Sequence, residues 1–185
     1  NADRKRLFEE TYQIADLEVD NEQQLLKVLY VCVRSAFSPK VQLVVALRYI
    51  NGLQVKRIAA LLGTDEDTIS KILYRWRSQS KNHQWNFDQE VDFNNEPQLK
   101  MVLKIVYVMF TEGFRLSAKG ALTDQVLCED ALSILQTLIK MKVKATGEVK
   151  ALYALMLYHL ARACSRLNDI DELVELAQQD RSCWN

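Results

Sequence analysis

Residues 53–77 read LQVKRIAALLGTDEDTISKILYRWR, and this stretch decides the fold of the first half of the chain. Apolar and small residues recur there at helical spacing, in two stripes that Gly63 separates. The stripes contain Leu53, Ile58, Ala59 and Leu62, and then Ile69, Ile72, Leu73 and Trp76. Ala59 is small enough for two helices to cross closely, and Gly63 accepts the left-handed backbone that ends a helix. The pattern predicts a helix-turn-helix.

The residues after Gly63 predict where the second helix begins. Thr64 offers a hydroxyl cap, with Asp67 three residues later as its partner. Asp65 and Glu66 would stand at the positive end of the helix dipole. We expect this helix to run from Asp65 and to fray near Ser80. Four of its residues would point away from the packed face, namely Ser70, Lys71, Tyr74 and Arg75.

Charge is uneven along the chain although the net charge is zero. Residues 39–81 contain eight Lys or Arg against three acidic residues, which gives +5. Residues 1–38 carry −2, and residues 82–185 carry −3. Only the helix-turn-helix region is therefore basic, as contact with the phosphates of DNA requires.

The same residues carry a family resemblance. The upstream phrase VALRYINGL, followed by IA, Gly63, TI and LYRWR, resembles conserved region 4 of extracytoplasmic-function sigma factors of bacteria. The later phrases VLKIVYVMFTEGF, LCEDALSIL, ALYALMLYHLAR and QQDRSCWN resemble the long helical extension behind region 4 in one subgroup of these proteins. The resemblance covers the chain from about Asn21 onward.

The resemblance implies an alternative sigma factor, which acts in transcription initiation by binding rather than by catalysis. Region 4 lays its recognition helix in the major groove of the upstream promoter element, and an apolar patch binds the β flap of core RNA polymerase. The implied DNA-binding residues are Lys56, Arg57, Thr68, Ser70, Lys71, Tyr74 and Arg75. Asp65, Glu66 and Asp67 depart from the family pattern, because they place negative charge where DNA would approach. They either accept hydrogen bonds from cytosine amino groups or weaken binding.

We expect an all-α fold in two domains. Residues 1–80 form the helix-turn-helix domain, residues 81–96 a linker, and residues 97–185 a helical, tetratricopeptide-like extension. In the first domain we also expect helices over residues 4–15 and 22–36, and a third that starts with Ser38 as cap and Pro39 as first residue and ends at Asn51. The linker aromatics Trp85, Phe87 and Phe93 would dock on a neighbouring surface.

The extension shows helical periodicity from Pro97 onward. Its first helix buries Leu99, Val102, Leu103, Val106, Met109 and Phe110. Further helices are expected over residues 126–142, 149–167 and 170–179, the first of them opened by Thr123 and Asp124. Trp184 is too apolar to remain in water, so we expect it to fix the C-terminus onto the bundle. Opposite net charges favour docking of the extension on the first domain, as a regulator.

Several functional classes lack support in the sequence. We expect no enzyme, cofactor or metal: the acidic residues near Cys128 lack a Glu-x-x-His pattern, and the four cysteines form no C-x-x-C pair. Reduced thiols and a packing role for His159 are the default expectations. No apolar run is long enough for a membrane span, and no signal peptide opens the chain, so we expect a cytoplasmic protein.

Two other classes stay open at this point. A ligand-gated transcription regulator would share the helix-turn-helix, and a helical scaffold that has lost DNA binding would explain the acidic triplet. The opening Asn1-Ala2 resembles the scar of a cleaved tag, and a sigma-type N-terminal module is absent from these residues. We therefore expect a fragment. The sequence does not indicate the promoter, the signal or the oligomeric state.

Overall fold

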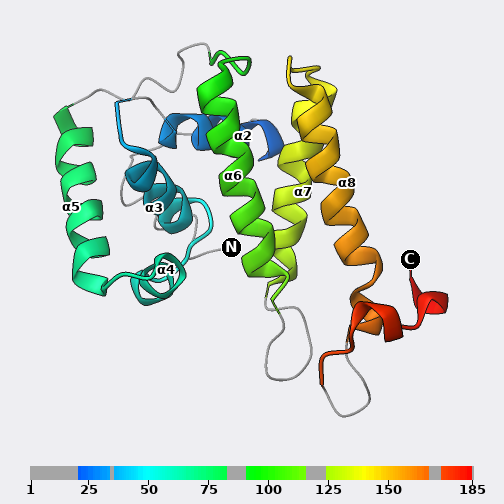
Figure 1. Cartoon of the computed structure of the whole chain (residues 1–185). Helices are drawn as coiled ribbons and strands as arrows, with labels where there is room; N and C mark the ends of the chain where they lie inside the picture. Colours follow the sequence, from blue (N-terminus) through cyan, green and yellow to red (C-terminus); the bar gives the residue numbers. More distant parts are fainter. Residues whose placement is uncertain (1–20, 34–35, 83–90, 116–123, 167–171, 185) are drawn as a thin grey trace. The chain divides into compact units, whose positions relative to one another are not determined.

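The structure is a computed structural model that describes residues 21–33, 36–82, 91–115, 124–166 and 172–184. This described part is all-α, as the sequence predicts (Figure 1). Two compact units divide the chain, residues 1–105 and 106–185, and the boundary falls inside α6, Glu96–Gly113. The expected helix over residues 4–15 and the linker residues Trp85 and Phe87 lie outside the described residues.

Unit 1 contains α2, Asn21–Cys32, and α3, Pro39–Tyr49, which pack on each other. Pro39 is the first helical residue of α3, as predicted. Ser38 is the N-cap residue, as predicted, although its hydroxyl makes no cap hydrogen bond. The buried side chain of Gln42 instead donates to the carbonyl of Phe37, at 2.7 Å, and closes the turn.

The ends of these two helices also differ slightly from the prediction. The predicted helix 22–36 ends at Cys32, ahead of the Ser38-Pro39 pair, whose proline disfavours helical backbone at the residue before it. Helix α3 ends at Tyr49, and the backbone then turns through Gly52 with a φ of 68°. Arg48 donates to the carbonyl of Leu53 at 3.0 Å, which fixes the loop into the next helix.

Phe93 has the docking role that the sequence predicts for the linker aromatics. Its ring meets the ring of Tyr30 edge-on, with centroids 4.9 Å apart. The hydroxyl of Tyr30 donates to the carbonyl of Phe93 at 3.0 Å. The segment that leads into α6 is therefore attached to α2 within unit 1.

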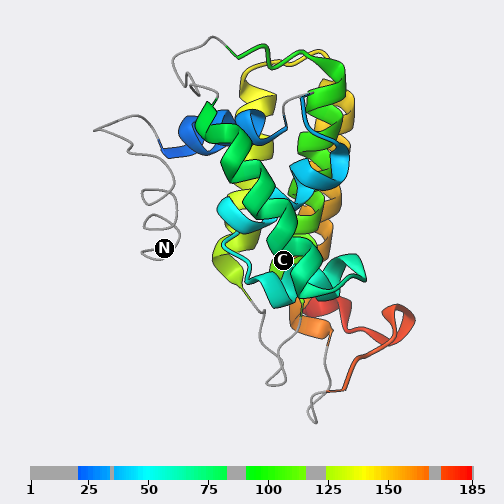
Figure 2. The same cartoon turned by 90° about the vertical axis from the view of Figure 1, so that its left-hand side faces the viewer.

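Unit 2 is built from the end of α6 together with α7, Gln125–Lys140, and α8, Thr146–Ala161. Helices α7 and α8 lie side by side (Figure 2). Gly113 ends α6 where α7 begins, and a Cβ on Gly113 would lie 2.6 Å from the carbonyl oxygen of Asp124. This close approach admits only glycine.

The predicted core of the first extension helix is confirmed, since all six of its predicted apolar residues are buried. Asp124 caps α7 by accepting from the N–H of Leu127 at 3.0 Å, whereas Thr123 lies outside the described residues. Helix α7 ends two residues before the predicted Lys142, whose φ of 54° is incompatible with a continued helix. Helix α8 starts at Thr146 and ends at Ala161, earlier at both ends than the predicted range 149–167.

The prediction of an α-helix over residues 170–179 is wrong for the described part of that range. Residues 172–175 are not helical, and only a short 3₁₀ turn, η2 (Leu176–Gln178), follows. Leu173 and Leu176 are 70% and 48% exposed, so no apolar face is buried that would stabilise a helix. The side chain of Gln179 donates to the carbonyl of Val174 and holds the irregular backbone instead.

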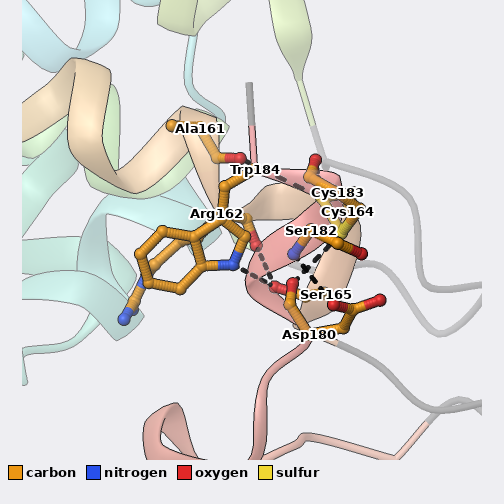
Figure 3. Close-up of a disulfide and its surroundings, with 8 residues drawn as sticks. All are labelled: Ala161, Arg162, Cys164, Ser165, Asp180, Ser182, Cys183 and Trp184. Carbon is orange, nitrogen blue, oxygen red and sulfur yellow. Dashed lines mark hydrogen bonds between the residues drawn. A yellow bond between two sulfur atoms is a disulfide. The ribbon is translucent and has the colours of Figure 1, made fainter.

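Trp184 attaches the C-terminus to unit 2, as the sequence predicts. Its indole N–H donates to the hydroxyl of Ser165 at 2.8 Å (Figure 3). Its ring meets that of Tyr158 edge-on, with centroids 5.6 Å apart. Ser165 belongs to η1, Ala163–Ser165, which follows α8. Within the described ranges, no helix is both long and apolar enough to cross a bilayer.

The expectation of four reduced cysteines is wrong for one pair. Cys164 and Cys183 form a disulfide, with Cα atoms 6.3 Å apart (Figure 3). The chain between them returns to η1 at η3, Arg181–Cys183, which brings two distant cysteines within bonding range. A separation of 19 residues carries no local motif, so the pairing has no signature in the sequence. Cys32 and Cys128 are buried free thiols, as expected.

Candidate nucleic-acid interface

Helices α4, Val55–Leu62, and α5, Glu66–Asn82, form the predicted helix-turn-helix and pack on each other. Gly63 ends α4 in the left-handed conformation, with φ 61° and ψ 39°. The N–H of Thr64 then donates to the carbonyl of Ala59 at 3.0 Å, which closes the end of the helix. The backbone therefore reverses where Gly63 predicts, with Ala59 buried beneath the crossing.

The N-terminal cap of α5 differs from the predicted one. Asp65, rather than Thr64, caps the helix: its carboxylate accepts from the N–H of Thr68 at 2.7 Å and from the hydroxyl of Thr68 at 2.8 Å. These two hydrogen bonds from Thr68 lower the pKa of Asp65. Helix α5 begins at Glu66, one residue later than predicted, because Asp65 occupies the cap position.

The inner face of α5 is fixed by packing. Ile69, Leu73 and Trp76 are all buried, as the helical stripe predicts. The rings of Trp76 and Tyr49 lie 5.1 Å apart, and Nε of Arg77 donates to the hydroxyl of Tyr49 at 2.6 Å. These contacts attach α5 to α3 and set which of its faces is turned outward.

The outer face of α5 carries the four side chains that the sequence assigns to it. Ser70, Lys71, Tyr74 and Arg75 are all exposed, and Tyr74 is 73% exposed. Their spacing of three and four residues places them on one face of the helix. Hydroxyl groups, two cations and an aromatic ring are the groups that bind base edges and phosphates.

Lys71 forms an ion pair on this face of α5. Its ammonium lies 2.6 Å from the carboxylate of Asp67, one turn earlier, and both side chains are largely exposed. The hydrogen bond and the charge of Asp67 raise the pKa of Lys71. Among the described side chains, Arg75 has no ion pair. Two members of the acidic triplet thus have local roles, because Asp65 caps α5 and Asp67 pairs with Lys71.

The remaining predicted residues have different settings. Lys56 is exposed and Arg57 half-buried in the first turn of α4, an element separate from the outer face of α5. Thr68 is half-buried, and its hydroxyl is already engaged by Asp65. Sequence reasoning missed Asp65 as the cap and Arg77 as the link to Tyr49. An Asp followed three residues later by Thr was a local signal for the cap, whereas the Arg77 contact spans 28 residues and had none.

Unit 2 contains a second group of polar side chains around His159. Its ring packs near Phe110 and Phe114, with centroids 6.4 and 5.6 Å away, which is the expected packing role. Burial and the nearby charges of Arg162 and Arg166 lower the pKa of His159. Nδ1 of His159 is buried and has no hydrogen-bond partner among the described residues. In the described parts of the chain, no three His, Cys, Asp or Glu side chains gather in a way that could hold a metal.

Comparison with known proteins matches parts of the chain to a protein family and to a relative. Residues 98–185 match a family of unknown function (DUF6596), a domain found in sigma-70-like proteins. An uncharacterized protein of Rhizobium meliloti (strain 1021) is 27% identical over 163 residues, which cover 87% of this chain. Those residues span only 38% of that relative's own length. No solved structure matches the chain.

Proposed function

We propose that this chain is the promoter-reading part of an alternative sigma factor, with the outer face of α5 as its DNA-binding surface. The observation that carries the proposal is the exposure of Ser70, Lys71, Tyr74 and Arg75 on one face of a capped helix whose opposite face is buried. A major groove about 12 Å wide admits such a helix. The match of residues 98–185 to a domain found in sigma-70-like proteins supports the same interpretation.

The division of labour follows from the side chains. Arg75 and Lys71 supply donors for base edges or phosphates, and Lys56 and Arg57 anchor α4 to the DNA backbone. Asp67 holds Lys71 in the unbound chain, so DNA must compete with this carboxylate. The half-buried Leu61 and Leu62 of α4 are candidates for the apolar patch that binds the β flap of core RNA polymerase. A cytoplasmic location and regulation by residues 97–185 belong to the same proposal.

The test is fluorescence anisotropy of the chain on promoter-like duplex DNA across a salt series. Replacing Lys71 and Arg75 by Ala should raise Kd by about tenfold or more for each side chain that binds a base edge. For each side chain that binds a phosphate, the replacement should reduce the salt slope by about 1. Lys150→Ala, an exposed lysine on α8, removes the same charge and should leave Kd nearly unchanged.

A substitution at Asp67 should change the DNA affinity in the opposite direction. Asp67→Ala removes a negative charge from the outer face and frees Lys71, so it should tighten binding. Because Asp67 is not the cap of α5, the helix should remain intact by circular dichroism. Unchanged affinity and salt slope in all of these variants would contradict a DNA-binding role for α5 and would favour a scaffold.

A further inference from the structure

The C-terminal segment, residues 172–184, contacts the described residues of unit 2 at η1 and at the end of α8. The N–H of Val174 donates to the carbonyl of Arg166 at 2.9 Å, and Trp184 contacts Ser165 and Tyr158. Its helices, η2 and η3, have three residues each. Leu173 and Leu176 are exposed and Trp184 is half-buried, so little apolar surface of the described segment stabilises this attachment. The Cys164–Cys183 disulfide is the strong link between this segment and η1.

Both cysteines of the pair are exposed, one in η1 and the other in η3 (Figure 3). A dissolved thiol can therefore reach the bond, since exchange requires access to a sulfur atom. The other two cysteines differ in this respect. Burial raises the pKa of Cys32 to about 12 and that of Cys128 to about 11, so neither supplies a thiolate near neutral pH. Exchange is thus confined to the exposed pair.

The charged side chains near the exposed pair have contacts of their own. The guanidinium of Arg166 donates to the carbonyl of Phe114 at 3.1 Å, and that of Arg181 lies 5.7 Å from the ring centroid of Trp184. The carboxylate of Asp180 accepts from the N–H of Ser182 at 2.8 Å, and the hydrogen bonds from Ser182 lower its pKa. The exposure of the two cysteines, rather than a cluster of cations, therefore carries the exchange.

We propose that Cys164 and Cys183 form a reversible redox site, a clasp that fastens the C-terminal segment when oxidised and releases it when thiols reduce it. A low-molecular-weight thiolate bonds to one sulfur, the bond between the cysteines breaks, and the leaving thiolate takes up a proton. A second thiolate attacks the small-molecule sulfur of the mixed disulfide, and the remaining cysteine leaves as a thiolate that takes up a proton. The chain gains two electrons and two protons, and two thiols become one small disulfide.

Reduction of the disulfide affects Trp184 first, because this residue directly follows Cys183. In the closed form its indole is held between the hydroxyl of Ser165 and the ring of Tyr158. Without the covalent link, noncovalent contacts must hold the end of the chain against its conformational entropy. The reduced chain should therefore release Trp184 and uncover Tyr158 on α8.

The first experiment measures the pair across glutathione buffers of increasing reducing strength, by alkylation and mass spectrometry of the acid-quenched, denatured chain. We expect two alkylated cysteines in oxidising buffer, Cys32 and Cys128, and four in reducing buffer, with full return on reoxidation. Four alkylated cysteines throughout would show that no bond forms. Two throughout would show a permanent cross-link. Either result would overturn the proposal.

The second experiment measures release of the segment as the rate of tryptic cleavage after Arg181, with reduction only after the quench. We expect cleavage about tenfold faster in the reduced chain, and Cys164→Ser with Cys183→Ser should give the fast rate in both buffers. Cys32→Ala, which keeps the pair, should retain the difference. Cleavage after Lys150 in α8 serves as the internal reference and should not change. Equal rates after Arg181 in both redox states would refute the clasp.

Discussion

Helices α5 and α8 are of similar length but differ in how far they bury their large apolar side chains. Helix α5 buries Ile69, Leu73 and Trp76 in its own unit and exposes mainly polar groups. Helix α8 buries Val149 and Met156, yet leaves large apolar side chains exposed. These are Leu155, Leu157 and Tyr158, which are 44%, 41% and 53% exposed. A polar, cationic face suits a polyanion, whereas an apolar face suits another protein surface. The two helices therefore differ in the chemistry of the side chains that they expose.

The largest expected effect concerns the residue that anchors α5. Trp76→Ala should remove about 3 to 5 kcal/mol of stability, because the indole is 2% exposed and the cavity is flanked by Tyr49. The exposed counterpart on α8 is Tyr158, and Tyr158→Ala should cost less than about 1 kcal/mol. Urea denaturation followed by circular dichroism measures both. Equal destabilisation by the two substitutions would mean that the faces of α5 and α8 do not differ as described.

The next effect concerns the backbone of the turn. Gly63→Ala should destabilise unit 1 by about 1 kcal/mol, because a φ of 61° strains any residue with a Cβ even though nothing lies within 4 Å. Gly147→Ala in the first turn of α8 is the matched control. A Cβ there also meets nothing within 4 Å, and no positive φ opposes it. Thermal melts should show a lower Tm for Gly63→Ala and an unchanged or higher Tm for Gly147→Ala.

The smallest effect is a pH dependence confined to unit 2. The pKa of His159 is lowered in the folded chain by burial and by Arg162 and Arg166, so the folded state disfavours the proton that the unfolded state accepts near pH 6.5. The contribution of His159 to the free energy of unfolding is therefore fully present above about pH 6.5. It falls as the pH drops through that value toward the lower pKa of the folded state.

Denaturation midpoints measured from pH 8 to pH 5.5 test this dependence. His159→Phe should flatten it, since Phe keeps the ring contacts with Phe110 and Phe114, and Nδ1 donates to or accepts from no group in the described part of the chain. His83→Gln removes the other histidine of the chain and should leave the slope of the wild type. A slope that survives in His159→Phe would place its origin in another group.

Local signals predicted the first unit well. Gly63 gave the turn, the stripes gave the buried faces, and the 3.6-residue period placed Ser70, Lys71, Tyr74 and Arg75 outward. The cap was misassigned because Thr64 and Asp65 are both good cap residues, and the choice depends on backbone angles that a sequence does not contain. The ion pair of Lys71 with Asp67 followed the i, i+4 rule but was not predicted.

The end of the second unit was predicted poorly, for a different physical reason. Residues 170–179 have helical propensity, but helices of this length need a buried face, and Leu173 and Leu176 find none. The Cys164–Cys183 bond and the contact of Trp184 with Ser165 each span 19 residues. Periodicity and spacing report neighbours within a few residues, so such contacts become visible only in the folded chain. The assignment of DNA-binding residues stays a prediction for both helices of the turn.

The two buried free cysteines can report how fast each unit opens. Cys32 lies in the core of unit 1 and Cys128 in that of unit 2, and neither thiol reaches solvent in the closed structure. A thiol-specific reagent can modify either one only during a transient opening of its own unit. Pulsed alkylation followed by peptide mass analysis would therefore measure the opening rate of each unit in a single sample, without any substitution.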